Sequence, residues 1–587
     1  FNKPEDTNSG LAVKGVVYNE MKGAMSSDMQ LFAAEINKAL FPTTTYHHNS
    51  GGDPQQIPRL TYAEFIDFYQ TYYHPSNAIF LTFGNMSAKS HQQRFEDKVL
   101  QHFDKSAHQY LVANEQRYNA PQLHTNDYPI APNSDEKNKT YIALSWLLDN
   151  TSDAEKMVST ALVCQLLFGN SASPLRQAME KAAIGGGVLP ISGLNTKIKE
   201  MSFTCGLFGC EPEDKQKVEQ LVLDNLTRLA EEGLPYEMVT SVLHQFELGQ
   251  REIKAGQLPY GLQLILPILP AALHAGEVSK ALNIEPILKS LSEKITNENY
   301  IKELIKTLFI DNQHRVTVVM KPNASLNEQK QQAYNEWLAD IEQKLTEDQK
   351  LELVAKHQQL VARQKETSNE TLLPKVQISD VDLTLPSIVP SLITSHKFNL
   401  TCYEAGTNGL AYQHIYLSLP TFTTNELMLL PVYRQLVTNL AVGDDDYVNN
   451  QLVKSALLGG FNVDYSFRTD KLDIESLYGF IRFSAHGLVR NQQPAFDYML
   501  KAIDEVRFDE SARIKELLNA FLMQCEMSIS PNGQSLAMAA AASGLSKKAS
   551  IEHALSALES SCFVKQLLTT LDTEKGVTKL QHSLTSL

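Results

Sequence analysis

The same order of predicted elements occurs twice along this chain of 587 residues. The first copy consists of a strand, a helix, a glycine turn and a second strand with alternating apolar residues, at 141–148, 153–168, 185–187 and 201–207. The second copy has the same order at 416–419, from about 425, at 459–460 and at 477–485. Helices follow each copy. This repeat predicts two copies of one α+β domain, each with an antiparallel sheet and helices packed on one side of it.

A stretch of different composition separates the two copies. Residues 324–366 are charged, rich in Gln and free of Pro and Gly, which is typical of helices with solvated outer faces. We interpret them as a helical hairpin that joins the two copies. Residues 371–386 follow as an extended connector bounded by turn residues.

Residues 11–110 alternate between helix and strand signals. The first helix is stopped by Pro42, and its apolar face consists of Met29, Phe32, Ile36 and Leu40. A capping box at Thr61 and Glu64 opens a second helix, whose apolar positions are Phe65, Phe68, Tyr69 and Tyr72. Residues 78–83 are then predicted as a strand, and the polar residues 114–139 as an interdomain linker.

The charge balance bears on the kind of partner. The sequence has 67 Asp and Glu against 52 Lys and Arg, a formal net charge of −15. Such an excess repels phosphate backbones, which argues against nucleic-acid binding and favours basic or neutral partners, including cationic peptides. The longest apolar stretch, 262–275, is interrupted by Pro267 and Pro270 and is too short for a membrane span. We therefore expect neither a nucleic acid nor a membrane as a partner.

The cysteines indicate a reducing compartment. Six are spread along the chain without a CxxC pair, so we expect buried thiols instead of disulfides or a zinc ribbon. The start shows no secretory signal pattern, and we predict a cytoplasmic location, with an organelle matrix as the alternative. Because residue 1 is Phe in a loop-like sequence, we interpret the chain as a fragment or a processed product.

Common catalytic motifs are absent from the sequence, including GxxxxGK[ST], GxSxG, HExxH and HxxEH. His47 and His48 are adjacent, so on a helix they would point about 100° apart and could not both face one metal ion. A polar turn is the simpler interpretation of that pair. The glycines at 185–187 lack the following Lys of a phosphate loop and favour a bend.

The segment 15–23 contains the most informative acidic residue. Glu20 lies among Val16, Val17 and Met21, so we expect this segment to pack against a core. A carboxylate buried there requires a cation or a metal ion. The residues alone leave open whether Glu20 is a ligand or a surface carboxylate beside Lys22.

Several stretches resemble a known family. GVVYNEMKGAM (15–25) is similar to the segment that carries the distal glutamate zinc ligand in the M16 metallopeptidases, specifically their presequence protease branch. Residues 50–85, with an SGGDP turn and a YHPSNA helix end, resemble the stretch that follows it. SFTCGLFG (202–209), the charged hairpin and LLGGFNVDYSF (457–467) also have counterparts, so the likeness extends over essentially the whole chain.

The resemblance implies a zinc-dependent endopeptidase that degrades unfolded peptides such as targeting peptides. Its α+β domains would form part of a clamshell: the rest of a first domain, a second domain, a hairpin linker and a third domain, at 1–113, 114–323, 324–375 and 376–587. Zn²⁺ would be held by Glu20 and two histidines of an HxxEH motif, whose glutamate is the general base. That motif and a fourth domain lie outside this sequence, so we expect no catalytic residue in it and no activity of this chain alone.

Two other interpretations stay open. One is a non-catalytic scaffold subunit of the same fold, and the other is one half of a split peptidase whose motif lies on a second chain. The intact segment around Glu20 favours the enzyme, because a scaffold has no need of that residue. We expect the full-length protein to be a monomer.

Overall fold

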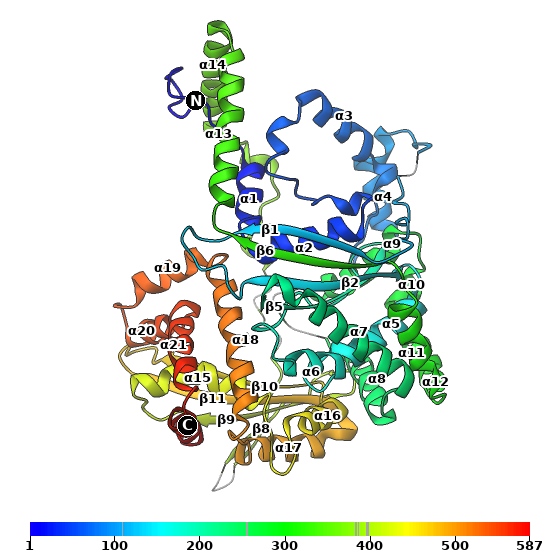
Figure 1. Ribbon diagram of the computed structural model, residues 1–587, viewed down its shortest axis with the longest axis vertical. Coiled ribbons are helices and arrows are strands. Elements are labelled where there is room, and N and C mark those ends of the chain that lie inside the picture. Colours follow the sequence, from blue (N-terminus) through cyan, green and yellow to red (C-terminus); the bar gives the residue numbers. More distant parts are fainter. Residues whose placement is uncertain (109, 254–255, 257, 382–383, 385–386, 395–397) are drawn as a thin grey trace.

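A large sheet organises the first half of the molecule (Figure 1). The computed structural model describes residues 1–108, 110–253, 256, 258–381, 384, 387–394 and 398–587. Within them the large sheet has the strand order β1-β6-β2-β5-β3, and β4 also pairs with β5. The strands are β1 (Gln122–Pro129), β2 (Thr140–Asn150), β3 (Gly187–Val188), β4 (Gly193–Asn195), β5 (Glu200–Cys210) and β6 (Arg315–Asn323). β1 runs parallel to β6, and the other ladders are antiparallel.

Helices cover one face of the large sheet, as the sequence predicts. They are α5 (Ala154–Phe168), α6 (Pro174–Lys181), α7 (Lys215–Glu232), α8 (Tyr236–Arg251), α11 (Glu285–Lys294) and α12 (Asn299–Ile305). The core beneath them is built around Trp146 and Phe203, which are fully buried. The indole N–H of Trp146 donates to the carbonyl of Phe309 at 3.0 Å. Cys205 is buried in the same core, and burial raises the pKa of its thiol, so it is the core thiol that the sequence predicts.

The opposite face of the large sheet is covered by α2 (Asp28–Leu40). This helix buries the face predicted from its spacing, namely Met29, Phe32, Ile36 and Leu40. These side chains share one core with Val316 and Val318 of β6. The large sheet therefore has apolar cores on both faces, and the second layer comes from residues that precede the sheet in the sequence.

The other elements of residues 1–113 are helices joined by loops. They are α1 (Val16–Ala24), η1 (Thr45–His47), η2 (Ile57–Arg59), α3 (Tyr62–Tyr72), η3 (Pro75–Asn77), α4 (Ala88–Lys98) and η4 (Leu100–His102). Thr61 and Glu64 form the predicted capping box of α3. The strand predicted at 78–83 is wrong, because no strand in the described part of the chain lies beside these residues to accept ladder hydrogen bonds.

The stretch 114–139 was predicted as a linker, yet it contains β1. Its residues are mostly polar, and its alternation is weak because β1 is an edge strand paired only with β6 in the described sheet. The long apolar stretch lies in α9 (Tyr260–Leu273), which contains Pro267 and Pro270, and is followed by α10 (Val278–Leu282). Within the ranges given above, no helix is both long and apolar enough to cross a membrane.

The predicted hairpin is present as α13 (Leu326–Lys344) and α14 (Glu347–Lys365). It projects from the end of β6, and the N-terminus lies beside it (Figure 1). Thr346, between the two helices, forms a capping box with Gln349. None of the hairpin residues, all of which the structure describes, is fully buried. Of the predicted connector 371–386, residues 382–383 and 385–386 lie outside the described residues.

The second half repeats the order of elements, which confirms the predicted α+β repeat. It consists of β9 (Leu410–Ser418), α15 (Thr424–Val437), α16 (Tyr447–Leu457), β10 (Gly460–Thr469), β11 (Leu477–Leu488), α17 (Gln492–Asp504) and α18 (Ser511–Ile529). The antiparallel small sheet has the order β10-β11-β9, which matches the order β3-β5-β2 in the large sheet. In both copies a glycine begins a strand: Gly187 begins β3 and Gly460 begins β10.

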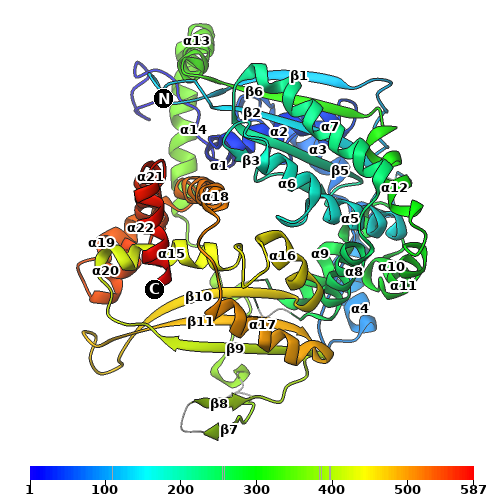
Figure 2. The ribbon, with the colours of Figure 1, turned by 60° about the horizontal axis from the view of Figure 1, so that its bottom comes forward.

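Helices cover one face of the small sheet, around Phe483, Val432 and Leu518. The chain ends in further helices, α19 (Gly533–Ala542), α20 (Lys547–Ala554), α21 (Ala557–Thr570) and α22 (Glu574–Thr585). Strands β7 (Ser391–Thr394) and β8 (Asn399–Cys402) form a separate ladder outside the small sheet (Figure 2).

Helix α8 joins the two halves. The side-chain amide of Gln245 donates to the carbonyls of Ser455 and Leu458 at 2.6 and 2.7 Å. Three buried leucines, one from α8 and two from the strands β9 and β11, form a small core: Leu248, Leu410 and Leu488. The contact therefore combines apolar packing with hydrogen bonds to the C-terminal end of α16.

A buried ion pair forms a second contact between the halves. A guanidinium N–H of Arg513, on α18, donates to Glu180 of α6 at 2.7 Å and to Glu516 at 3.0 Å. The guanidinium also lies over the ring of Tyr447, 4.7 Å from its centroid. The side chain of Arg513 is only 6% exposed, so this pair is largely removed from water.

Candidate functional site

The predicted ligand Glu20 lies on α1, a helix in which only Tyr18 is buried. Val16 is 75% exposed and Val17 is 54% exposed. The expectation that this segment packs into a core is therefore wrong for these two residues, because no described element covers their side of the helix. Met21 is half-buried.

The carboxylate of Glu20 is exposed and has no partner in the described part of the chain, neither a hydrogen bond nor an ion pair with Lys22. A buried carboxylate at Glu20 would require a cation or a metal ion, but the expectation that Glu20 is buried is wrong. A carboxylate with free lone pairs is nevertheless available to an incoming metal ion. The geometry thus supports Glu20 as an accessible acceptor and not as a buried charge.

The described residues contain no group of three or more His, Cys, Asp or Glu side chains that could hold a metal ion. His47 and His48 meet edge to face, with ring centroids 5.1 Å apart, at the end of the short helix η1. They form no such group with Glu20. A zinc ion bound to Glu20 would therefore take its other ligands from polypeptide beyond these residues.

Helix α1 is held from one side by the hairpin. The hydroxyl of Tyr334, on α13, accepts a hydrogen bond from the backbone N–H of Val13 at 3.2 Å. Burial and a side-chain hydrogen bond to Tyr334 raise the pKa of the Tyr18 hydroxyl above its usual value. Val13 and Tyr334 are 321 positions apart, so no local sequence signal could have revealed this contact.

A glycine loop holds α1 from a second side. A Cβ added to Gly51 would lie 2.3 Å from the sulfur of Met21, so the loop packs closely against this flexible side chain, which would have to move for any larger residue at that position. Close by, the amide of Asn49 donates to the sulfur of Met25 at 3.6 Å. The SGGDP turn noted in the sequence is thus a packing partner of the helix that carries Glu20.

A large apolar surface follows on α3 and the next segment, and we call it the α3 surface. Its side chains are all 40% exposed or more: Leu60, Tyr62, Phe65, Phe68, Tyr69, Tyr72, Tyr73, Ile79, Phe80 and Phe83. The helix prediction for α3 is confirmed, but its apolar face is not buried against any described element. Exposed apolar side chains gathered along one segment favour contact with other polypeptide.

A polar network ties the residues before the large sheet to the sheet itself. Glu115 is buried and accepts hydrogen bonds from the backbone N–H and the hydroxyl of both Thr43 and Thr44. Burial raises the pKa of Glu115, but these hydrogen bonds outweigh that effect and hold the pKa below its usual value. The N–H of Glu115 donates to Glu200 at 2.7 Å, and Arg117 donates to the same carboxylate at 2.8 Å.

His314 lies in the same network, at the start of β6. Its Nδ1 accepts from the backbone N–H of Tyr118 at 3.2 Å, and its Nε2 lies 2.9 Å from the carbonyl of Leu40. Burial lowers the pKa of His314 to about 4. These contacts fit a neutral ring with its proton on Nε2.

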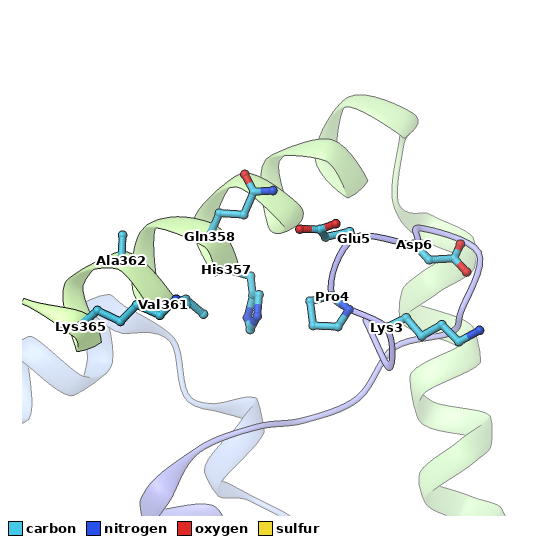
Figure 3. A pocket seen from close by; sticks show the side chains of 9 residues that line it. All are labelled: Lys3, Pro4, Glu5, Asp6, His357, Gln358, Val361, Ala362 and Lys365. Carbon is cyan, nitrogen blue, oxygen red and sulfur yellow. The ribbon is translucent and has the colours of Figure 1, made fainter.

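An open groove of about 760 Å³ lies between the N-terminal loop and α14 (Figure 3). Residues 3–6 line one side of it, and His357, Val361 and Lys365 line the other. It contains charges of both signs but no cluster of metal-ligating side chains in the described residues. The groove therefore lies between the N-terminal loop and the hairpin, and its described residues form no metal site.

Two family models match this chain. Residues 320–567 match the model for the associated region of M16 peptidases of subfamily C, and residues 59–246 match the Peptidase M16 inactive domain. Together they span most of the sequence.

Curated relatives align over nearly the whole chain. The mitochondrial presequence protease of Danio rerio is 26% identical over 98% of this chain and 56% of its own length. Presequence protease 1, chloroplastic/mitochondrial, of Arabidopsis thaliana is 27% identical over 91% of this chain and 50% of its own length. The chain thus spans about half the length of the curated relatives it matches. The crystal structure of the periplasmic protease PqqL from Escherichia coli is 15% identical, covers 94% of this chain and 59% of that one, and has a TM-score of 0.39, too low for a comparison of geometry.

Proposed function

The chain belongs to the M16 peptidase family, and we propose that it is part of a zinc-dependent endopeptidase that degrades unfolded peptides such as targeting peptides. The observation that carries this proposal is the extent of the match, since 98% of the chain aligns with a relative named presequence protease. The activity is proposed for the whole protein, because the relatives are about twice as long as the aligned region.

In this enzyme Glu20 is the carboxylate ligand of zinc, beside two histidines of an HxxEH motif. Its exposed, unpartnered carboxylate supports that role. Zinc with three protein ligands lowers the pKa of a bound water and polarises a carbonyl. The part of Glu20 is to supply an anionic oxygen from a helix that Tyr334 and Gly51 hold in place.

An extended peptide can add to a free sheet edge through backbone hydrogen bonds, which gives loose sequence preference. Strand β9 supports such binding, because it pairs with β11 on one side and with no described strand on the other. Its exposed Tyr412 and Tyr416 supply apolar contacts beside that edge. The net charge of −15 is compatible with basic peptides.

The predicted division into parts at 1–113, 114–323, 324–375 and 376–587 is retained as part of the proposal, with a monomeric full-length protein. The names of the Danio rerio and Arabidopsis thaliana relatives favour an organelle matrix over the cytoplasm as the location.

The zinc role is tested by Glu20→Gln in the full-length protein. The neutral amide is a weaker ligand, so we expect zinc affinity to fall by at least about tenfold and peptide cleavage to fall with it. Glu96→Gln, an exposed carboxylate on α4, is the control. Zinc content by mass spectrometry and cleavage of a fluorogenic peptide are the measurements. Unchanged zinc content and activity in Glu20→Gln would rule out the assignment.

Residues 1–587 alone should not cleave peptides, because Glu20 is the one zinc ligand that the resemblance identifies in them. Chelator-sensitive cleavage by this chain would contradict that expectation.

A second candidate is one half of a split peptidase, and the exposed α3 surface favours it, since a separate chain could cover that surface. Intact mass and N-terminal sequencing of the native gene product distinguish the two. An HxxEH motif on the same polypeptide supports the single-chain enzyme, and its absence supports a split enzyme or a scaffold subunit.

A further inference from the structure

The N-terminal segment follows the hairpin along several contacts. Residues 3–6 lie across the groove from α14 (Figure 3). The side chain of Glu342, near the end of α13, faces Gly10. Val13 then donates to the hydroxyl of Tyr334, and the hydroxyl of Tyr18 lies near the same side chain, which helps to raise the pKa of Tyr18. The hairpin therefore contacts the chain both before α1 and within it.

The same face of α13 also reaches the loop beyond α2. Trp337 lies one turn after Tyr334, with ring centroids 6.0 Å apart. The guanidinium of Arg59, in η2, lies 5.7 Å from the centroid of the Trp337 ring. The segment that leads into α1 and the segment around Arg59 therefore both contact the same face of α13.

Helix geometry links these contacts to Glu20. Successive residues turn by about 100°, so Glu20 lies about 160° around α1 from Tyr18. The contact of Tyr18 with Tyr334 therefore sets the rotation of α1 and with it the direction of the Glu20 side chain. Met21 against Gly51 limits the same rotation from a second side.

We propose that the hairpin is a positioning element for Glu20, with Tyr334 as the positioning residue that sets the rotation of α1. This inference rests on the proposed function in one respect, the role of Glu20 as a zinc ligand. The hairpin then has two tasks: it joins the two halves of the chain, and it holds the helix that presents the ligand. A hairpin that serves only as a tether needs no contact with α1.

The first test is hydrogen exchange on the 587-residue chain with Tyr334→Phe, which removes the hydroxyl and keeps the ring. Loss of an ordinary hydrogen bond changes a local opening equilibrium by about fivefold, so peptides covering residues 11–24 should exchange about fivefold faster. Ala333→Ser, at the neighbouring exposed position on α13, is the matched control and should leave exchange unchanged. Unchanged exchange at residues 11–24 in Tyr334→Phe would overturn the proposal.

The second test separates positioning from simple support. In the full-length protein loaded with Co²⁺, Tyr334→Phe should change the visible absorption of the metal and weaken zinc binding about tenfold, while Ala333→Ser does neither. Faster exchange with unaltered absorption and affinity would mean that Tyr334 supports α1 without directing Glu20, which also overturns the proposal. If Glu20→Gln itself leaves zinc binding intact, the proposed function fails, whatever the exchange result.

Discussion

His314 shows how hydrogen bonds fix the charge state of a single side chain. Its Nδ1 is occupied as an acceptor by the N–H of Tyr118, so a proton can be added there only if that bond is lost. Burial is the main cause of the lowered pKa of His314. The positive charge of Arg117 nearby lowers this pKa further. The folded protein therefore holds this ring neutral well below the usual pKa of histidine.

This arrangement predicts a loss of stability in mild acid. The pKa of His314 is about 4 in the folded chain, against about 6.5 for an unfolded histidine, so the unfolded chain takes up the proton first as the pH falls. The free energy of unfolding should decrease between pH 6.5 and 4, by about 3 kcal/mol in total from this group. Urea unfolding at pH 7, 6 and 5 measures the change.

The control is His314→Gln, whose amide can donate and accept at similar positions but does not titrate. Its stability should depend less on pH across that window, whereas His108→Gln, at an exposed position, should behave like the unchanged protein. Equal slopes for His314→Gln and the unchanged protein would contradict the prediction.

For Glu20, the sequence predicted a role as a metal ligand but not the exposure of the side chain. The resemblance identified it as a ligand candidate, and that assignment stays a prediction. Its exposure was not foreseen, because whether Val16 and Val17 are covered depends on chain that lies far away in sequence or outside these residues. The contact between Tyr18 and Tyr334 was missed for the same reason.

Whether a helix or strand could be predicted depends on how close in the sequence the residues that stabilise it lie. Helix α2 was predicted from the spacing of its apolar residues, and the hairpin from a charged composition without Pro or Gly; both signals are local to the element. The strand at 78–83 was predicted wrongly and β1 was missed, because a strand exists only with a neighbour, and the neighbour of β1 is β6, far along the chain. Periodicity predicts an apolar face, but it does not say what covers that face.

The α3 surface predicts self-association of the 587-residue chain. Contiguous exposed aromatic side chains favour contacts between molecules, so we expect dye binding and light scattering that rise with concentration. Phe65→Glu with Tyr69→Lys places a favourable pair at positions i and i+4 and should reduce both signals several-fold. Leu472→Glu, at an isolated position that is 99% exposed, is the control and should change neither. Equal scattering from all three proteins would show that this surface does not drive association.

At the scale of the whole molecule, the ion pair of Arg513 and Glu180 predicts coupling between the two halves. Removing one member of a buried pair leaves an uncompensated charge and costs about 3–5 kcal/mol, so Arg513→Ala should be strongly destabilising. The double variant with Glu180→Ala should be less destabilised than the sum of the single variants, by about 1–3 kcal/mol. Urea unfolding of the four proteins gives this coupling energy.

The exposed pair of Lys344 and Asp340 on the hairpin serves as the comparison. It is more than half exposed on both sides, so its coupling should be below about 1 kcal/mol. Additive effects at Arg513 and Glu180 would show that this ion pair does not hold the halves together.

The place of β6 between β1 and β2 has a consequence for synthesis. β1 and β2 leave the ribosome early, but their shared neighbour is made only after the helices α5 to α12. Until residue 323 has emerged, β1 and β2 lack the strand that lies between them, and the apolar core that α2 shares with β6 is incomplete. We therefore expect this half to be exposed to aggregation during translation and slow to refold from denaturant, whereas the small sheet, whose strands are close together in sequence, can assemble soon after it is made.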